Sequence, residues 1–338
     1  MEYDIDHLSD AELEPILGAS NTLNREAQPR SIDLTADELR VFTTSPGMTY
    51  RRFHVHSDEG ALGGMGNGRY PSDGTNAGLL LTQIQVLPDY RRRGVGTLMF
   101  RHLVSLAEEL SRDRLQGFIF DTVPAGEAFA DAVGAIGTLE FHENVLKIAD
   151  LDRELMASWA DIGAERAPGY SVRLIEGPVP EDLYDDIAHL YHVLERDMPT
   201  PADFEPRIWT AERVADEEAH YLKGTDALAA FAVHEASGRT VGMSQLIRRK
   251  TDPTTWVVTV TMVDPDHRGR SIGKWVKGTV NVAALKRWEG GVYQETGNAF
   301  TNEPMLAINH AMGFEHELTA TSCLLVVENA RRYLASRV

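Results

Sequence analysis

The feature that most constrains this chain is a short motif that occurs twice, 177 positions apart. Val86–Arg91 reads Val-Leu-Pro-Asp-Tyr-Arg, and Val263–Arg268 reads Val-Asp-Pro-Asp-His-Arg. Each copy follows an apolar run typical of a strand and leads, through a glycine-containing turn, into an amphipathic helix. A period of this length corresponds to a whole domain and far exceeds a solenoid repeat. The sequence therefore predicts two like domains produced by duplication, which a chain of 338 residues accommodates.

Apolar patterns place further elements in the same order around both copies. In the first half we predict strands at Tyr50–Ser57, Gly78–Val86 and Gly117–Asp121, and a further strand that ends near Ile148. We predict helices at Val95–Leu110 and Glu127–Val133. In the second half we predict strands at Ser171–Glu176, Leu228–His234, Thr240–Ile247, Trp256–Val263 and Gly291–Thr296, and a helix at Pro304–Met312. Pro168-Gly169 closes a mixed stretch and indicates a domain boundary. We therefore expect an α/β fold with a mixed sheet in each of two domains, 1–160 and 170–338.

Two local signals refine the first half. Thr35-Ala36-Asp37-Glu38 has the form of a capping box and predicts the start of a helix. The glycine-rich segment 60–68 indicates a mobile hairpin or a glycine-weakened strand. No helix follows this segment directly, so it does not fit a phosphate cradle.

The charge balance excludes several classes of partner. Asp and Glu number 51 against 33 Lys and Arg, which gives a net charge of −18. Such a field repels nucleic acid and anionic membranes and favours cationic ligands. The only cysteine is Cys323, so an internal disulfide is impossible and a cysteine metal site is not expected. We find no signal peptide and no apolar run of membrane-spanning length, and we expect a cytoplasmic protein that binds neither nucleic acid nor membrane.

The repeated motif has a direct chemical interpretation. A strand delivers the chain into a tight turn, and a helix begins at once. The first turn of a helix has unpaired N–H groups and a partial positive charge, so successive amides there can surround a pyrophosphate. Glycine lets the backbone approach the phosphate oxygens, and Arg91, Arg92 and Arg93 add positive charge.

The string Arg91-x-x-Gly94-x-Gly96, entered from a strand ending in Val-x-Pro, resembles the acyl-CoA-binding motif of GCN5-related N-acetyltransferases (GNATs). In the second copy Arg268 and Gly273 match, and Ser271 replaces the first glycine. The segment from Asn302 to Gly313-Phe314 resembles the closing signature of the family, and the string around Asn298 resembles tandem-domain bacterial members, among which mycothiol synthase is the best known. The resemblance implies that acetyl-CoA is bound, without a metal, by these residues: Val86, Arg91, Arg92, Arg93, Gly94, Val95, Gly96, Met262, Val263, Arg268, Gly269, Arg270, Ser271, Ile272, Gly273, Asn298 and Asn302.

The resemblance also implies direct attack of an amine on the thioester, with a strand amide near Ile84–Leu87 or Thr261–Asp264 donating to the oxyanion. The family often has a glutamate on the strand before the motif and a tyrosine on the helix before Gly-Phe. Neither half has this pair, since Ala130 and Asn309 stand at the tyrosine position. Our catalytic candidates are therefore Glu295, near the end of its strand, and Asn309.

Three functions remain open from the sequence. The first is acetylation of a primary amine on a small molecule, by a monomer or homodimer whose second half is catalytic. The second is an acyl-CoA-binding or regulatory module without turnover, which the absent Glu and Tyr favour. The third is acetylation of protein lysines. His54 and His56 alternate on one predicted strand, but we identify no third ligand that would complete a metal site.

Overall fold

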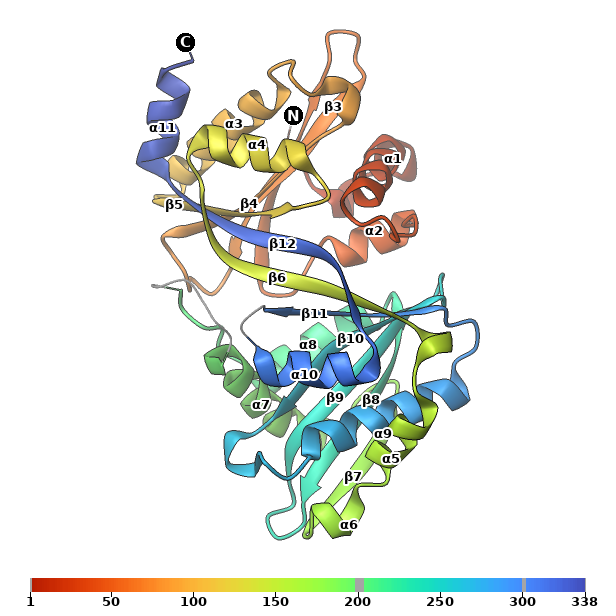
Figure 1. Cartoon of the computed structure of the whole chain (residues 1–338). Coiled ribbons are helices and arrows are strands. Elements are labelled where there is room, and N and C mark those ends of the chain that lie inside the picture. The colour runs from red at the N-terminus through yellow and green to blue at the C-terminus, as the bar shows by residue number, and fades with distance from the viewer. Residues whose placement is uncertain (1, 198–203, 300–301, 338) are drawn as a thin grey trace. The chain divides into compact units, whose positions relative to one another are not determined.

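The computed structural model describes residues 2–197, 204–299 and 302–337, and the chain has an α/β fold that divides into two compact units (Figure 1). The first unit consists of Met1–Phe141, Pro201–Glu205 and Leu318–Val338, and the second of His142–Thr200 and Pro206–Glu317. Strands β6 (Ile136–Lys147) and β12 (Glu315–Val326) therefore each begin in one unit and end in the other. This division differs from the expected domains 1–160 and 170–338, because the stretch from His142 packs with the second unit and the C-terminal segment with the first.

The first unit contains a mixed sheet in which β4 and β5 are parallel and the other neighbouring pairs are antiparallel. Helix α3 makes the crossover that a parallel pair requires. The strands follow the order β1 (Glu2–Tyr3), β2 (Met48–His56), β3 (Leu62–Pro71), β4 (Leu79–Val86), β5 (Arg114–Phe120) and β12. The helices of this unit are α1 (Asp10–Ala27), α2 (Ala36–Phe42), α3 (Val95–Glu109), α4 (Pro124–Val133) and α11 (Val327–Ala335).

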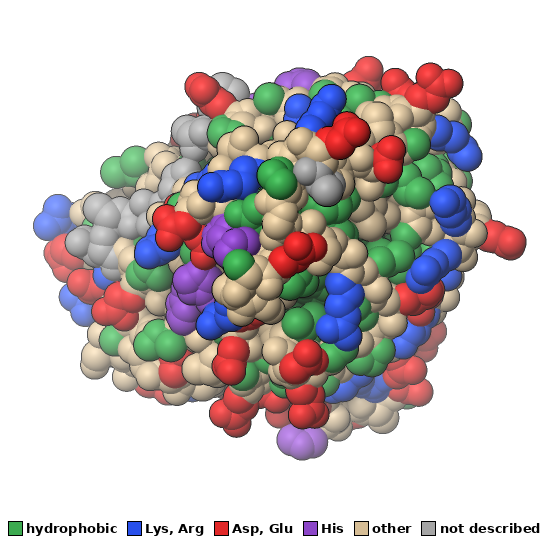
Figure 2. All heavy atoms as spheres, turned by 90° about the horizontal axis from the view of Figure 1, so that it is seen from below, with side chains coloured by type: hydrophobic (Ala, Val, Ile, Leu, Met, Phe, Trp, Pro, Cys, Tyr) green, Lys and Arg blue, Asp and Glu red, His purple; other side chains and the backbone are tan. Residues whose placement is uncertain are grey.

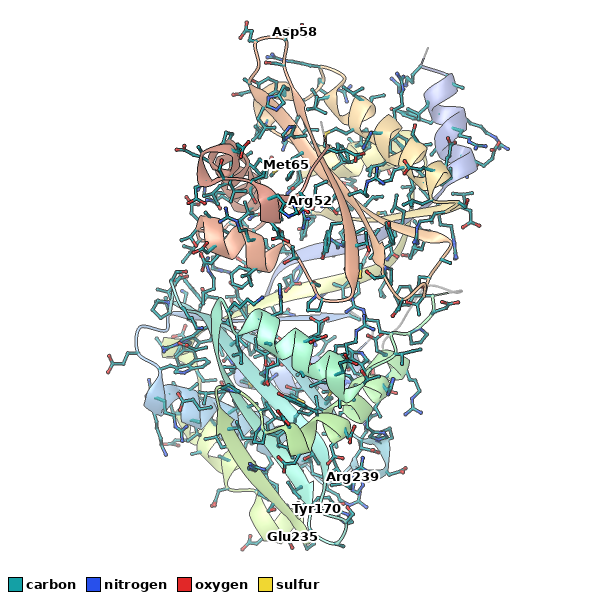
Figure 3. All side chains as sticks on the ribbon, turned by 180° about the vertical axis from the view of Figure 1, so that it is seen from behind. Arg52, Asp58, Met65, Tyr170, Glu235 and Arg239 are labelled. Carbon is teal, nitrogen blue, oxygen red and sulfur yellow. The ribbon has the colours of Figure 1, made fainter. Side chains whose placement is uncertain are left out.

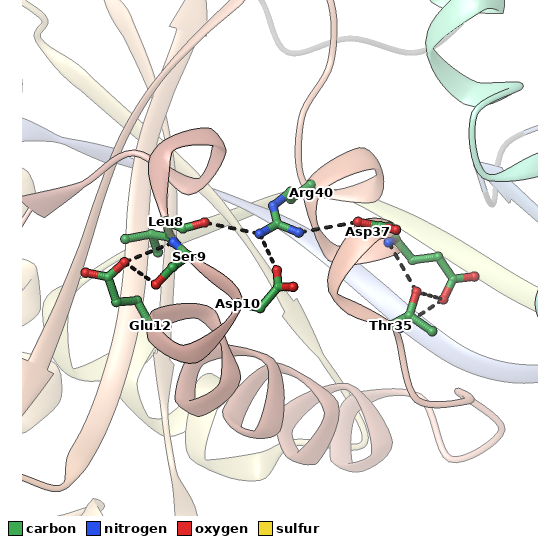
Figure 4. A network of polar contacts seen from close by, with 8 residues as sticks. Leu8, Ser9, Asp10, Glu12, Thr35, Asp37 and Arg40 are labelled. Atoms are coloured by element: carbon green, nitrogen blue, oxygen red, sulfur yellow. Dashed lines mark hydrogen bonds and ion pairs between the residues drawn. The ribbon is translucent and has the colours of Figure 1, made fainter.

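Helices cover both faces of this sheet. Residues of α3, α4 and α11 form one buried cluster with Leu80 and Leu115. On the other face α1 and α2 enclose Met65, which Figure 3 labels on β3. Capping boxes hold the N-termini of α1 and α2, formed by Ser9 with Glu12 and by Thr35 with Glu38 (Figure 4). The second capping box confirms the helix start predicted at Thr35. Arg40 of α2 donates to Leu8 O at 3.1 Å and Asp10 Oδ1 at 2.9 Å, which ties α2 to the start of α1.

The glycine-rich segment forms β3, which lies under α3 with three glycines on alternate positions. A Cβ added to Gly64 would lie 2.9 Å from Met99 Sδ, and one added to Gly68 would lie 2.7 Å from Leu106 Cδ2. At Gly66 an added Cβ would lie 2.4 Å from the backbone oxygen of Gln83 on β4. The glycines are therefore required for the close approach of α3 and β4, and the segment is a buried strand for most of its length.

We expect Gly66→Val to lower the free energy of unfolding by about 3 kcal/mol, because the new side chain overlaps a backbone atom that cannot turn away. The matched control is Gly18→Ala in α1, where an added Cβ meets nothing within 4 Å. This control should raise stability by about 0.5–1 kcal/mol through helix propensity. Urea unfolding of the two variants measures both effects, and a Gly66→Val protein as stable as wild type would refute the packing argument.

The second unit repeats the same arrangement. Its strands follow the order β11 (Tyr293–Ala299), β10 (Thr255–Val263), β9 (Arg239–Arg249), β8 (Thr225–His234) and β7 (Tyr170–Glu176). The pair β10–β11 is parallel, and the other neighbouring pairs are antiparallel. The helices are α5 (Arg153–Ala160), α6 (Gly163–Arg166), α7 (Tyr184–Asp197), α8 (Ala211–Tyr221), α9 (Ile272–Arg287) and α10 (Glu303–Met312).

Two layers of helices enclose this sheet as well. On one face α5 and α9 pack with Trp256 and Val258, and on the other α7 and α8 pack with Phe231 and Met262. Helix α5 lies so close to α9 that a Cβ on Gly278 would come 2.5 Å from Trp159 Cβ. The stretch that we expected to end the first domain is thus part of the core of the second unit. Within the described ranges, no helix is both long and apolar enough to cross a bilayer.

Candidate functional site

The two turns that precede α3 and α9 have the same backbone shape. In the first, Arg92 has a φ of 60° and Gly94 a φ of 85°. At the equivalent positions of the second, Gly269 has a φ of 77° and Ser271 a φ of 61°. The left-handed conformation disfavours residues with a Cβ by roughly 1–2 kcal/mol, so each turn places glycine at one of its two such positions and tolerates strain at the other. Alternation of left- and right-handed residues before a helix turns successive amides toward one point, as an anion site requires.

The motif arginines fasten these turns to the preceding strands. Arg91 Nε donates to Val86 O at 3.1 Å, and Arg268 Nε donates to Val263 O at 2.9 Å. Arg91 also pairs with Glu26 of α1, at 2.6 Å to Oε1, and Arg268 pairs with Asp197 at the end of α7. The expectation that Arg91 adds free positive charge is therefore corrected, because its charge is already matched by a carboxylate.

The other residues that we expected to bind CoA lie in or next to these turns. Arg270 Nη1 donates to the backbone oxygens of Asp266 and Arg268, both at 3.1 Å, while Arg93 lies over the Tyr90 ring at 5.7 Å. Val95-Gly96 and Ile272-Gly273 are the first residues of α3 and α9, and the Met262 side chain is buried in the α7 layer, so only its backbone is available to a ligand.

Polar contacts from other elements hold the second turn. Asp264 Oδ2 lies 2.6 Å from His189 Nε2 on α7, and His267 Nδ1 lies 2.8 Å from the Tyr170 hydroxyl on β7. The His234 ring lies 5.0 Å from that of His267. Figure 3 labels Tyr170 beside the β8–β9 connection, and the face seen from below in Figure 2 shows a group of histidine side chains among charged residues. The loop that would bind phosphate is thus anchored on several sides.

Beyond the turns, the parallel strands of each unit diverge. In the second unit β10 and β11 pair only from Thr255–Val257 to Tyr293–Glu295. In the first unit β4 and β5 pair only from Leu79–Leu81 to Arg114–Gln116. Asp264 N donates to Val241 O at 2.8 Å, so by strand alternation the Val263 amide points away from β9 and toward the opening. Such an opening can admit an extended ligand between two strands.

Only the second unit adds a β-bulge at this place. The register of β10 against β9 shifts between Val258 and Val260, whereas β4 pairs with β3 without a shift. Before the bulge Trp256 and Val258 face α9, and after it Val260 and Met262 face α7. A bulge exchanges the faces of successive side chains and re-aims the strand, and bulges often lie beside active sites.

On the α9 face of the opening, three polar side chains form a chain of hydrogen bonds. Lys277 Nζ on α9 lies 2.5 Å from Asn309 Oδ1 on α10, and Asn309 Nδ2 lies 2.6 Å from Asn298 Oδ1 on β11. Lys277 and Asn309 are buried, and Asn298 is half-buried. The expected residue Asn302 instead caps α10, where its side chain accepts from Met305 N at 3.4 Å. The structure thus joins Asn298 and Asn309 and adds Lys277 to them.

Carboxylates lie on the opposite face of β11. Strand alternation places Glu295 and Gly297 on the face away from Asn298. A Cβ added to Gly297 would come 2.8 Å from Glu143 Oε1, so the Glu143 carboxylate covers the diverged part of β11 on the Glu295 side. Burial raises the pKa of Glu143, and the nearby Glu317 carboxylate raises it further. The two catalytic candidates Glu295 and Asn309 therefore lie on different faces of the strand, with Glu143 as an additional acid near Glu295.

Glu143 could not be identified as a site residue from the sequence, because it lies in a strand that we assigned to the first domain. No motif surrounds it, and a long-range contact places it in the second unit. Lys277 lies beside the apolar stripe of its helix, where a lysine is normally exposed. Comparison with the repeat could have identified Lys277, because the equivalent position of α3 is Phe100.

At the described positions of the first unit that correspond to Lys277 and Asn309, apolar residues replace these polar groups. Its equivalent helix ends at Gly134, as α10 ends at Gly313, so Ala130 corresponds to Asn309. Phe129 lies beside the start of α3, 3.6 Å from a Cβ added to Gly96. Within the described residues of the chain, no group of three or more His, Cys, Asp or Glu is arranged to hold a metal ion.

A turn suited to a pyrophosphate before a helix, followed by two diverging parallel strands between helical layers, is the arrangement expected from the resemblance to GNATs. Residues 21–129 match the model of the Acetyltransferase (GNAT) family. This stretch is therefore a GNAT domain, and members of this family transfer acyl groups from acyl-CoA.

Solved structures extend the likeness to the whole chain. A tandem GNAT protein from the clavulanic acid biosynthesis pathway, solved without AcCoA, is 22% identical with a TM-score of 0.78, covering 97% of this chain and 98% of that one. A GCN5-related N-acetyltransferase from Sphaerobacter thermophilus is 16% identical with a TM-score of 0.63, covering 95% and 94%. A glucosamine N-acetyltransferase region of a fungal multi-domain GH3 β-N-acetylglucosaminidase is 12% identical with a TM-score of 0.62, covering 96% and 38%. The chain thus has the tandem GNAT fold, and a search of curated proteins finds no match to it.

Proposed function

We propose that the protein transfers an acetyl group from acetyl-CoA to a primary amine of a small molecule, and that the second unit carries out this reaction. The observation that supports this proposal most is the two-sided polar site at the β10–β11 opening. Donor groups line the face that continues from the α9 turn, and carboxylates line the other face. A thioester and an amine could therefore meet in the opening from opposite sides.

The residues then take distinct roles in a direct attack. The amides of the 268–273 turn hold the diphosphate of CoA, and the Val263 amide donates to the thioester oxygen as it gains negative charge. Glu143 accepts a proton from the substrate ammonium, directly or through water, with Glu295 on the same face of β11. The amine nitrogen then bonds to the carbonyl carbon, the carbon–sulphur bond breaks, and the leaving CoA thiolate takes up the second proton that the nitrogen loses as the amide forms. Burial raises the pKa of Glu143, which makes it a stronger base than an exposed carboxylate.

The acceptor is a cation in this proposal. The carboxylates of Glu143, Glu295 and Glu317 and the net charge of −18 favour an ammonium group and disfavour anionic substrates. We place the protein in the cytoplasm, where its donor acetyl-CoA is found, as a monomer or homodimer. The family-model match to residues 21–129 reflects the full glycine motif of the first unit, which we propose braces the pair or binds CoA without turnover.

A matched pair of substitutions tests which unit works. Gly96 and Gly273 are each the second residue of their helix, and a Cβ at either makes only ordinary contacts, at 3.6 and 3.7 Å. We expect Gly273→Trp to lower turnover at least about tenfold by covering the amides, and Gly96→Trp to leave it largely intact. Release of CoA from acetyl-CoA, measured with a thiol-reactive dye across a panel of amines, reports turnover.

The opposite ranking of the two variants would move the reaction to the first unit. Tight binding of acetyl-CoA in calorimetry, with no CoA release from any small amine or lysine peptide, would favour the binding module without turnover. Release with lysine peptides alone would make proteins the substrate.

A further inference from the structure

A buried lysine without an acidic partner lies at the centre of the second unit. Lys277 is 0% exposed, and its Nζ lies 2.5 Å from Asn309 Oδ1, 4.0 Å from Met305 Sδ and 5.7 Å from the centre of the Phe314 ring. Across the described parts of the chain, no carboxylate pairs with this amino group, and burial alone lowers its pKa to about 7. A buried amino group without a countercharge opposes folding, so stability does not explain why it is there.

The fold itself does not require a polar group at this position. Phe100 occupies the equivalent place on α3 and is 4% exposed in the core of the first unit. Ala130 stands where the second unit has Asn309, and counting back from the same helix-ending glycine places Ile119 at the position of Asn298. One copy of the duplicated fold thus packs three apolar residues where the other builds a hydrogen-bonded chain. The difference points to a ligand that only the second unit handles.

The donor and acceptor groups fix the direction of the hydrogen bonds from Lys277 through Asn309 to Asn298. A lysine ammonium has three donors and no acceptor. Asn309 therefore turns Oδ1 toward Lys277 and Nδ2 toward Asn298. Because an N–H group needs an acceptor, Asn298 turns Oδ1 inward, and its own Nδ2 is left to face outward. Among the described residues none accepts a hydrogen bond from Asn298 Nδ2, and Asn298 is half-buried at the diverged end of β11.

We propose that Lys277 is a positioning residue for acyl transfer, which fixes the amides of Asn309 and Asn298 so that Asn298 donates an N–H to the thioester of bound acyl-CoA. This inference rests on the proposed function of the second unit as an acyl-CoA site. Without the lysine, the Asn309 amide could rotate by half a turn, and Asn298 could then present an oxygen, which repels the thioester oxygen. The two amides transmit an orientation, and no proton passes along them.

The test compares acetyl-CoA carrying ¹³C at the thioester carbonyl when it is bound to wild type, Lys277→Met, Asn298→Ala and Lys286→Met. Lys286 lies on the same helix but is exposed, so its substitution is the matched control. Isotope-edited infrared spectroscopy measures the carbonyl stretch, which hydrogen bonding lowers. We expect a low frequency in wild type and Lys286→Met, and a higher one in Lys277→Met and Asn298→Ala. We also expect the two latter variants to lower kcat by about 10- to 100-fold with little change in KM.

A carbonyl frequency in Lys277→Met equal to that of wild type would overturn the inference, even if kcat fell, since loss of packing alone leaves the bound carbonyl unchanged. Asn298→Ala alters only a half-buried side chain, so it tests the same bond if Lys277→Met does not fold. The outcome also separates this inference from the proposed function. A frequency shift that both variants abolish, without turnover of any amine, would support the positioning role and refute the transferase. Turnover with the same carbonyl frequency in all variants would support the transferase and refute the positioning role. Failure of wild type to bind acetyl-CoA would refute both proposals.

Discussion

Replacing Glu143 with glutamine should lower kcat for amine acetylation by roughly 100- to 10,000-fold near neutral pH, the range that loss of a general base produces. The carboxylate lies against Gly297 in the opening of β11, and glutamine keeps the size of the side chain while removing its basicity. In wild type the acidic limb of the kcat/KM profile should report the raised pKa of Glu143. This limb should disappear in the Glu143→Gln variant.

The control for this prediction is Glu317→Gln, because the Glu317 carboxylate contributes to the raised pKa of Glu143. Removing that negative charge makes ionised Glu143 more favourable, so its pKa falls and the acidic limb should move to lower pH with a small change in the plateau rate. Steady-state rates from pH 5 to 9 measure the fall in the plateau rate of Glu143→Gln and the displacement of the acidic limb in Glu317→Gln. If Glu143→Gln left the profile unchanged, Glu295 would become the leading candidate for the base.

Replacing Lys277 with methionine should make the protein more stable at pH 7 and below, by roughly 3–5 kcal/mol before the lost hydrogen bond is subtracted. Burial lowers the pKa of Lys277 from 10.5 to about 7, so the folded state binds fewer protons than the unfolded state between these values. Wild-type stability therefore gains a contribution as pH rises from about 7 to 10.5, and lacks it below about 7. Methionine removes the titrating group and with it this slope.

Urea unfolding of wild type and Lys277→Met at intervals from pH 6 to 9.5 measures the difference, and Lys286→Met serves again as the exposed control. The gap between the two curves should narrow as pH rises. Groups common to both proteins cancel in this comparison. A constant gap across the range would show that Lys277 keeps an ordinary pKa in the folded protein, which would contradict the burial described for it.

Features of the structure that depend on neighbouring residues could be predicted from local sequence signals. The proline-containing turns and the helix starts at Val95 and Ile272 could be located from spacing and from the repeat. The capping box at Thr35 and the strand before each turn were equally accessible. These features depend on contacts within a few residues, so the sequence pattern contains most of their physical cause.

Features that depend on distant contacts could not be derived in this way. The shift at Val258–Val260 follows from how β10 pairs with β9, and no glycine or proline marks it. Glu143 reaches Gly297 only because β6 extends into the second unit. A lysine on an amphipathic helix is normally read as exposed, so the burial of Lys277 became visible only once α10 was seen to cover it.

The passage of β12 from the second unit back into the first has a consequence for biosynthesis. Ala320–Val326 pairs with β5, and α11 then adds Val327 and Ala330 to the core around α3. These residues are translated after the second unit, so the strands of the first unit that were translated earlier cannot complete their sheet until the second unit has been synthesised. The second unit lies between these segments and can reach its full set of strands earlier. Premature termination near position 317 would therefore damage the unit whose other strands were made first.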